Sequence, residues 1–219
     1  MIELLLAVAL SYFVGGIPTS IITGKVFRGI DIREHGSGNA GATNVFRVLG
    51  WKLALPVMLV DVLKGTFATL VISGLALGAV AIPDTGVRLA CGVAAVAGHI
   101  WTPYAHFRGG KGVGTAFGVL VSLAPLPALF AALIWITIVL FTGYVSLGSI
   151  TGALTVPVLL YVIPSVRGVP PDRILLVTTI LLALSIVFTH RSNIRRLLSG
   201  VENRFNTPFV RARNREVGA

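Results

Sequence analysis

The chain has 219 residues, 55% hydrophobic and 12% charged, and because soluble domains usually carry about 25% charged residues, a water-soluble globule is not expected. The 18 Lys and Arg against 8 Asp and Glu give a net charge of +10, which on so apolar a chain indicates anionic membrane lipids or an anionic substrate, and no nucleic acid. One cysteine excludes an intrachain disulfide and a zinc site built from several cysteines.

The apolar runs predict an all-α integral membrane protein. They fall at 2–24, 53–82, 86–105, 113–142, 147–163 and 174–189. Several approach the roughly 20 residues that cross a bilayer core. The first begins without a basic flank and ends at Lys25, so we expect a retained helix and no cleaved signal. Run 113–142 contains Pro125 and Pro127 and should divide into two short helices, whereas 53–82 should remain one long or tilted helix.

The basic residues orient these helices, because short loops rich in Lys and Arg stay on the cytoplasmic side. Fourteen of the 18 lie in 25–52, 106–112 and 190–219. Placing these segments on one face predicts about seven transmembrane helices, two of them short, with the N-terminus outside and the C-terminus cytoplasmic. A re-entrant hairpin or a five-span count is the main alternative. We expect one domain, 1–219, with cytoplasmic motif loops and a basic tail at 25–52, 106–115, 190–204 and 205–219.

The first cytoplasmic loop is rich in glycine and hydrogen-bond donors. It reads Gly36-Ser37-Gly38-Asn39-Ala40-Gly41-Ala42-Thr43-Asn44, followed by Arg47. Its glycines match the dinucleotide fingerprint, but that motif follows a strand, and here a membrane helix precedes it. Glycines can still let backbone N–H groups converge on an anion, with the Ser, Asn and Thr side chains as further donors and Arg47 close by. An anion site is therefore favoured over a flexible polar loop.

The second loop places a lysine among glycines at the start of a helix. Gly109-Gly110-Lys111-Gly112 is not a Walker A motif, because the lysine is followed by glycine. Unpaired N–H groups and the positive end of a helix dipole nevertheless favour a phosphate at such a position. The alternative is a basic anchor for helix orientation, which would not need the glycines.

The third polar element follows the last apolar run. It reads His190-Arg191-Ser192-Asn193, with Glu202 beyond it. If the helix continues, His190, Asn193 and Leu197 share one face. Alone, this segment would be interpreted as a basic helix end among lipid headgroups. Together with the two loops on the same face, it can complete a site for at least one phosphate, suited to a substrate with an anionic head and a hydrocarbon tail.

The three motifs in this order among membrane helices resemble the acyl-phosphate-dependent glycerol-3-phosphate acyltransferase family, PlsY. The resemblance runs over nearly the whole chain. It implies a bacterial plasma-membrane enzyme, active on the cytoplasmic side, that moves a fatty acyl group from acyl phosphate to the 1-hydroxyl of sn-glycerol 3-phosphate. The products would be lysophosphatidic acid and phosphate. The implied partners are both substrates and membrane lipids, and we expect a monomer.

The resemblance also assigns roles to residues. The expected catalytic residues are Ser37, Arg47, Lys111, His190 and Asn193. The residues expected to bind substrate or phosphate are Gly36, Gly38, Asn39, Gly41, Thr43, Asn44, Gly109, Gly110 and Gly112. Glu202 is similar to a glutamate regarded as structural. Within the apolar run 53–82, Asp61 and Lys64 lie three residues apart, which predicts a paired, helix-positioning role in preference to catalysis, and His99 is expected to be a buried, hydrogen-bonded histidine.

The chemistry of acyl phosphate agrees with such a site. It is a mixed anhydride with a good leaving group, so positioning and charge stabilisation can suffice without a covalent enzyme intermediate. Two proton acceptors remain open: His190, and the acceptor's own phosphate, whose second pKa is about 6. We favour the second. Aspartates are too sparse for a Mg²⁺ site, so no metal or cofactor is expected.

The rival function from another class is a membrane transporter for phosphate or an organic anion. A transporter would be expected to carry charges near the midplane and often an internal repeat. The chain shows no clear repeat, and apart from Asp61 and Lys64 its charges cluster at one face. The enzyme is therefore favoured.

Overall fold

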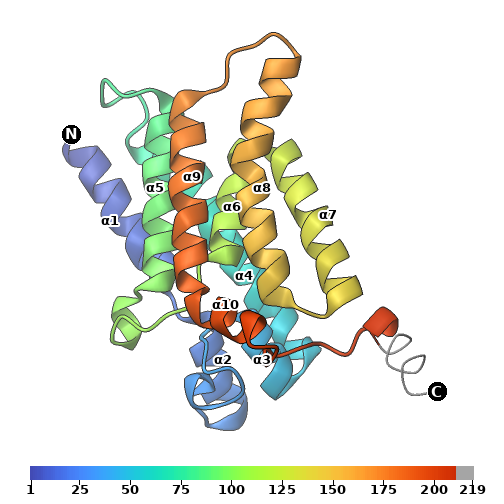
Figure 1. Ribbon diagram of the computed structural model, residues 1–219. Helices are drawn as coiled ribbons and strands as arrows, with labels where there is room; N and C mark the ends of the chain where they lie inside the picture. The colour runs from blue at the N-terminus through green and yellow to red at the C-terminus, as the bar shows by residue number, and fades with distance from the viewer. Residues whose placement is uncertain (211–219) are drawn as a thin grey trace. The chain divides into compact units, whose positions relative to one another are not determined.

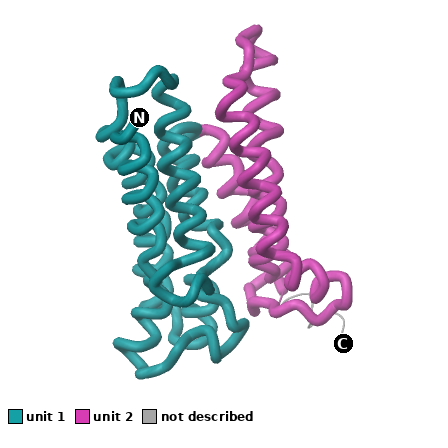
Figure 2. The backbone as a smooth tube through the Cα atoms, turned by 90° about the vertical axis from the view of Figure 1, so that its left-hand side faces the viewer, with its two compact units in different colours: residues 1–125 teal, residues 126–219 magenta. Residues whose placement is uncertain are grey.

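The computed structural model describes residues 1–210, and within them the secondary structure is entirely helical (Figure 1). The backbone contacts divide the chain into two compact units, residues 1–125 and 126–219 (Figure 2). The tail arginines Arg211, Arg213 and Arg215, which belong to the predicted basic tail, lie outside the described residues. The all-α prediction is confirmed for the part of the chain that is described.

The elements of unit 1 are α1 (Ile2–Gly16), α2 (Thr19–Arg28), η1 (Ile32–Glu34), α3 (Ala42–Leu49), α4 (Trp51–Leu70), η2 (Ile72–Leu75), α5 (Asp84–Ile100), η3 (Pro103–Ala105) and α6 (Val113–Leu123). Those of unit 2 are α7 (Pro125–Thr142), α8 (Val145–Val166), α9 (Arg173–Thr189) and α10 (Arg191–Leu198). Within residues 1–210, four helical segments are long and apolar enough to cross a membrane, with Ile2–Arg28 taken as one, or five if the bent pair α9 and α10 is a span.

Two apolar runs are divided differently from the prediction. The first does not form one helix over 2–24, because Pro18 lacks an N–H and disfavours helix before it, so α1 ends at Gly16 and α2 begins at Thr19. The run 53–82 is not one long helix either. α4 ends at Leu70, and a 3₁₀ turn and a left-handed glycine, Gly78, follow. The predicted break near Pro125 is confirmed, since α6 ends and α7 begins on either side of Ala124. The prediction of two short helices is wrong for α7, which has 18 residues and is long enough to cross a membrane, whereas α6 has only 11.

Small residues bring the helices of unit 1 into close contact. In the α1–α5 pair, a Cβ at Gly15 would overlap the backbone of Ala95, and one at Gly98 would overlap the carbonyl of Tyr12. In the α4–α6 pair, Cβ atoms at Gly65 and Gly118 would overlap backbone carbonyls of the facing helix. Without a Cβ the backbones can approach closely, as is common between membrane helices. These contacts fix the end of α5 and the start of α6, and therefore the loop that joins them.

Unit 2 is held by contacts between its helices and by the segment that follows α10. Trp135 Nε1 on α7 donates to Ser149 Oγ on α8 at 3.2 Å, and α8 also packs along α9. After α9 the chain bends by 59° into α10 at His190. Arg204 Nε then donates to the carbonyl of Thr142 at the end of α7, at 2.7 Å. The third predicted motif therefore sits in a corner braced from α7 and α8.

Candidate active site

Asn44 closes the first glycine loop from within. Its side chain is fully buried; Nδ2 donates to the carbonyls of Ile32 and His35 at 2.8 and 2.9 Å, and Oδ1 accepts the N–H of Ser37 at 2.7 Å. Gly36, in the left-handed region, lies against it, where a Cβ would overlap Oδ1. The sequence predicted that the side chain of Asn44 would donate to an anion. In the structure its amide instead bonds to the backbone of residues 32–37 and fixes their conformation. Because the N–H of Ser37 donates to Asn44, the group of Ser37 that suits a substrate is its hydroxyl.

The other predicted residues of this loop follow at and beyond its second half. Gly38 takes a left-handed conformation, and Gly41 precedes α3. Thr43 lies in the first turn of α3 and Arg47 in its last, and both are half-buried, as is Asn39 in the loop. The loop and α3 therefore present hydroxyl, amide and guanidinium groups from one continuous segment of 12 residues, Gly36 to Arg47.

The second glycine loop runs back along the end of α5. The N–H of Gly109 donates to the carbonyl of Ile100, and that of Gly110 to the carbonyl of His99, both at 3.0 Å. A Cβ at Gly109 would overlap the His99 carbonyl, and one at Gly110 would overlap His99 Nε2 and lie 2.6 Å from the carbonyl of Ala40. These glycines are therefore needed for close approach. Gly110 also touches the first loop at Ala40, so the structure brings the two predicted loops together.

Lys111 and the start of α6 come directly after this contact. Lys111 is half-buried, and Gly112, which follows it, has a φ of +82° and precedes α6. The N–H groups of Gly109 and Gly110 are already bonded to α5. The groups suited to a phosphate are therefore the Lys111 ammonium and the first turn of α6, where a helix has unpaired N–H groups.

Arg33 joins the two loops, and sequence reasoning counted it only as an orienting charge. Its Nη1 donates to the carbonyls of Ala105 and Arg108 at 2.9 and 3.3 Å. Its Nε and Nη2 donate to the carboxylate of Asp31, the shortest of these bonds being 2.6 Å. The hydrogen bond from Arg33 lowers the pKa of Asp31 to about 2. The spacing of Asp31 and Arg33 could have suggested their pairing, but nothing in the sequence indicates the loop carbonyls 72 and 75 residues away.

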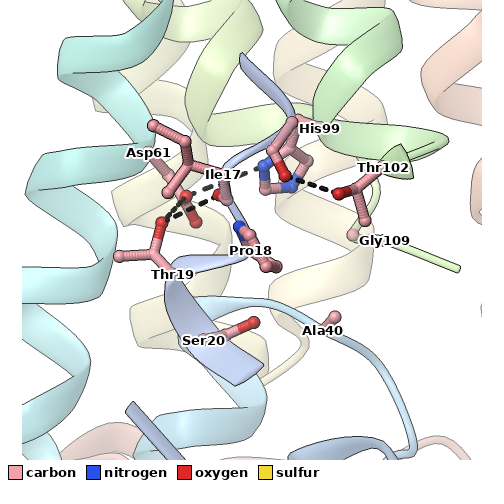
Figure 3. Close-up of a pocket in the computed structure, with 11 residues that line it drawn as sticks. Ile17, Pro18, Thr19, Ser20, Ala40, Asp61, His99, Thr102 and Gly109 are labelled. Atoms are coloured by element: carbon pink, nitrogen blue, oxygen red, sulfur yellow. Dashed lines mark hydrogen bonds and ion pairs between the residues drawn. The ribbon is translucent and has the colours of Figure 1, made fainter. Parts of the chain in front are cut away.

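Behind the two loops lies a buried polar cluster, which we define as Thr19, Asp61, Lys64 and His99. Figure 3 shows three of these side chains, Thr19, Asp61 and His99. Lys64 Nζ and Asp61 Oδ1 are 2.7 Å apart, so the predicted pair forms. Thr19 Oγ1 donates to the same carboxylate oxygen at 3.0 Å. His99 Nδ1 lies 3.6 Å from Asp61 Oδ1. A small pocket there is lined by this carboxylate, His99, Ala40 and both Gly109 and Gly110, so the cluster adjoins the loops.

The third motif forms a separate arrangement in unit 2. His190 is buried at the α9–α10 bend, and its Nδ1 is 2.8 Å from the carbonyl of Ile186. A carbonyl accepts hydrogen bonds, so Nδ1 carries the proton, and in the neutral ring the lone pair is on Nε2. Asn193 is also buried, and its Nδ2 donates to Glu202 Oε1 at 2.6 Å.

Glu202 is the centre of that arrangement. Besides Asn193, it accepts from Ser146 Oγ on α8 at 2.9 Å and from Arg196 Nε at 2.6 Å. Burial raises the pKa of Glu202, but the hydrogen bonds from Asn193, Arg196 and Ser146 outweigh that effect and leave the pKa below its usual range. Glu202 therefore ties α8 to α10 and orients Asn193.

Comparison with known proteins agrees with these observations. The family profile described as glycerol-3-phosphate acyltransferase matches residues 5–200. The chain is 43% identical to the glycerol-3-phosphate acyltransferase of Chlorobaculum tepidum, over 94% of this chain and 98% of the relative. It is 42% identical to that of Chlorobium phaeovibrioides, over 93% and 97%.

The solved structures that are similar belong to PlsY, an integral membrane glycerol 3-phosphate acyltransferase. Its glycerol 3-phosphate form superposes with a TM-score of 0.80 at 39% identity, covering 93% of this chain and 96% of that chain. Its lysophosphatidic acid form gives the same TM-score and identity, over 94% and 97%. Apolar helices, glycine loops and these likenesses define a helical integral membrane protein. The chain belongs to the glycerol-3-phosphate acyltransferase family, and it is an acyltransferase.

Proposed function

We propose that this chain transfers a fatty acyl group from acyl phosphate to the 1-hydroxyl of sn-glycerol 3-phosphate, giving lysophosphatidic acid and phosphate. The observation that carries the proposal is the contact of the two glycine loops, with Gly110 against Ala40, beside Lys111 and the start of α6. This arrangement gathers cationic and hydrogen-bonding groups suited to two phosphates. The acceptor and the product named for the related PlsY structures support the choice of substrates.

In the proposed reaction the acceptor hydroxyl attacks the acyl carbon and the bond from that carbon to the phosphate oxygen breaks. Lys111 and the first turn of α6 hold the acceptor's phosphate, while Arg47 and the Ser37 hydroxyl stabilise charge on the acyl phosphate. Asn39, Thr43 and the glycines Gly36, Gly38 and Gly41 shape and line that half of the site. Because phosphate is a good leaving group, substrate positioning and charge stabilisation can account for catalysis without a covalent enzyme intermediate.

The hydroxyl proton goes to one of two acceptors in this proposal. The phosphate of glycerol 3-phosphate has a second pKa of about 6, so it can accept the proton from the hydroxyl of the same molecule. We favour this substrate-assisted route. The alternative is His190, whose Nδ1 is bonded to the Ile186 carbonyl and whose Nε2 would be the base. Asn193, the other residue of the third motif, is oriented by Glu202 within unit 2.

We further propose that the protein is a monomeric, single-domain enzyme of the bacterial plasma membrane, with membrane lipids as partners and the site on the cytoplasmic side. Seven membrane helices would be α1, α4, α5, α6, α7, α8 and α9, with the N-terminus outside and the C-terminus inside. The supporting observation is that fourteen of 18 basic residues lie in the three segments assigned to the cytoplasmic face. Accessibility of single introduced cysteines, after Cys91→Ser, would test this topology.

The activity is tested by phosphate release from purified protein in a lipid mesophase, given acyl phosphate with and without glycerol 3-phosphate. We expect release to depend on the acceptor. Ser37→Ala and Arg47→Ala should abolish it, whereas Ser199→Ala and Arg28→Ala, at exposed positions, should not. Absence of acceptor-dependent release with both acyl phosphate and acyl-CoA would contradict the proposal. Uptake of phosphate or glycerol 3-phosphate by proteoliposomes without any acylation would support the transporter instead.

A further inference from the structure

His99 contacts the glycine loop with both its backbone and its ring. Its carbonyl accepts the N–H of Gly110 at 3.0 Å. Its ring edge faces the same residue, since a Cβ at Gly110 would overlap Nε2. Gly110, the residue before Lys111, therefore packs against the imidazole. The position of the ring limits how closely the glycine loop can approach α5.

The opposite edge of the ring is held by the ion pair of the buried polar cluster. His99 Nδ1 is 3.4 Å from Lys64 Nζ. It is 3.6 Å from Asp61 Oδ1, and Figure 3 shows the side chains of His99 and Asp61. The side chains of all three residues are less than 10% exposed. Charges buried in an apolar membrane segment are costly and are retained when they are paired and serve a function. Here both members of the pair lie at the Nδ1 edge of the imidazole.

The cluster is also anchored to the break in the first apolar run. Lys64 Nζ donates to the carbonyl of Ile17 at 2.9 Å, and the N–H of Thr19 donates to the same carbonyl at 3.0 Å. Thr19, the first residue of α2, donates to Asp61. Thr102 Oγ1, beyond the end of α5, donates to the carbonyl of Gly16 at 2.5 Å. The two residues beside the ring of His99, Asp61 and Lys64, are thus bonded to the segment that joins α1 and α2, and Thr102 ties the end of α5 to the end of α1.

We propose that His99 is a positioning residue for binding of the acceptor. Asp61 and Lys64 hold its ring, and the ring packs against Gly110. This contact positions Lys111 and the first turn of α6 to bind the acceptor's phosphate. The inference rests on the proposed function, since it assumes that this loop binds glycerol 3-phosphate. His99 acts through the loop and does not touch the substrate, so its loss should weaken acceptor binding more than acyl phosphate binding.

The test compares two amide substitutions that each mimic one ring nitrogen. His99→Asn keeps a polar group near Asp61 but removes the edge that faces Gly110, whereas His99→Gln can restore a polar atom there. A misplacement of about 1 Å can cost about 100-fold in catalysis. We therefore expect His99→Asn to raise KM for glycerol 3-phosphate by about 10- to 100-fold, with KM for acyl phosphate within about threefold. His99→Gln should recover part of the loss and leave KM for glycerol 3-phosphate about two- to fivefold above that of wild type.

His106→Asn is the matched control, because this histidine is exposed in the same loop and its left-handed conformation suits asparagine. It should leave both KM values unchanged. A selective change of KM is not expected from a purely structural defect, which would lower the thermal midpoint and the active fraction without distinguishing the substrates. Should His99→Asn fail to fold, the comparison of His99→Gln with wild type decides, and a selective KM rise of about twofold or more is then required.

Lys111→Met separates this inference from the proposed function. If Lys111→Met and His99→Asn both raise KM for glycerol 3-phosphate, both proposals stand. If Lys111→Met raises it and His99→Asn leaves it within twofold, or raises both KM values equally, the positioning role is refuted and the acceptor site stands. If Lys111→Met leaves it unchanged, the loop is not the acceptor site and the inference falls with it.

Discussion

Replacing Arg33 tests whether the two glycine loops act as one site. Its guanidinium bonds the Asp31 carboxylate and, through Nη1, the carbonyls of Ala105 and Arg108. Hydrogen bonds from a charged donor contribute about 1.5–3 kcal/mol each. The bond to Arg108 is long, at 3.3 Å, and therefore weak, and the Arg33 side chain is 23% exposed. The two bonds between the loops should therefore contribute about 2 kcal/mol of stabilising free energy together. That free energy corresponds to a factor of about 30.

Arg33→Ala should therefore lower kcat/KM for glycerol 3-phosphate by about 30-fold. Arg33→Lys should fall between, because an ammonium cannot reach the carboxylate and both carbonyls in the way a planar fork does. The assay is phosphate release at saturating acyl phosphate and varied acceptor. Arg28→Lys and Arg28→Ala, at an exposed position of α2, control for loss of a cytoplasmic charge. Activity of Arg33→Ala within twofold of wild type would refute the connection of the loops through Arg33.

Three further predictions concern stability, measured as the thermal unfolding midpoint. The pKa of Asp31 is lowered from 3.8 to about 2, so the unfolded chain binds more protons in that interval; the advantage of wild type over Asp31→Asn should be full above about pH 5 and vanish as pH falls through 2. Glu202→Ala should cost about 3 kcal/mol, since it leaves buried donors unpaired, whereas exposed Glu34→Ala should not change the midpoint. Gly118→Ala, which overlaps the α4 backbone, should cost about 1–3 kcal/mol, and Gly74→Ala, with nothing within 4 Å, should be neutral.

The helices were largely predictable because hydropathy and proline content are properties of a local segment. The apolar runs correspond to helices, and Pro125 correctly indicated the boundary between α6 and α7. The errors arose where hydropathy continued but the backbone could not. Pro18 interrupts an unbroken apolar run, and beyond Leu70 a 3₁₀ turn and the left-handed Gly78 replace the α-helix while the side chains remain apolar.

The three motifs were also identifiable from sequence, because residue type and spacing suffice to suggest an anion site. How each residue is used was not predictable. Asn44 was expected to offer donors to a ligand, but its amide bonds the backbone of residues 32–37. Gly109 and Gly110 were expected to cradle a phosphate, but their N–H groups bond to the end of α5. A donor's partner depends on which carbonyls the fold brings near, and spacing carries no such information.

By itself, the sequence determined that this chain is an all-helical membrane protein with polar, basic loops that suit phosphate chemistry, since composition, charge and local spacing are enough for that. The tertiary structure alone decided that Arg33 connects the loops and that the imidazole of His99 lies beneath Gly110. Those contacts join residues separated by up to 75 positions and depend on close approach of helix backbones at glycines. Such proximity is a property of packing, which no single segment of the chain contains.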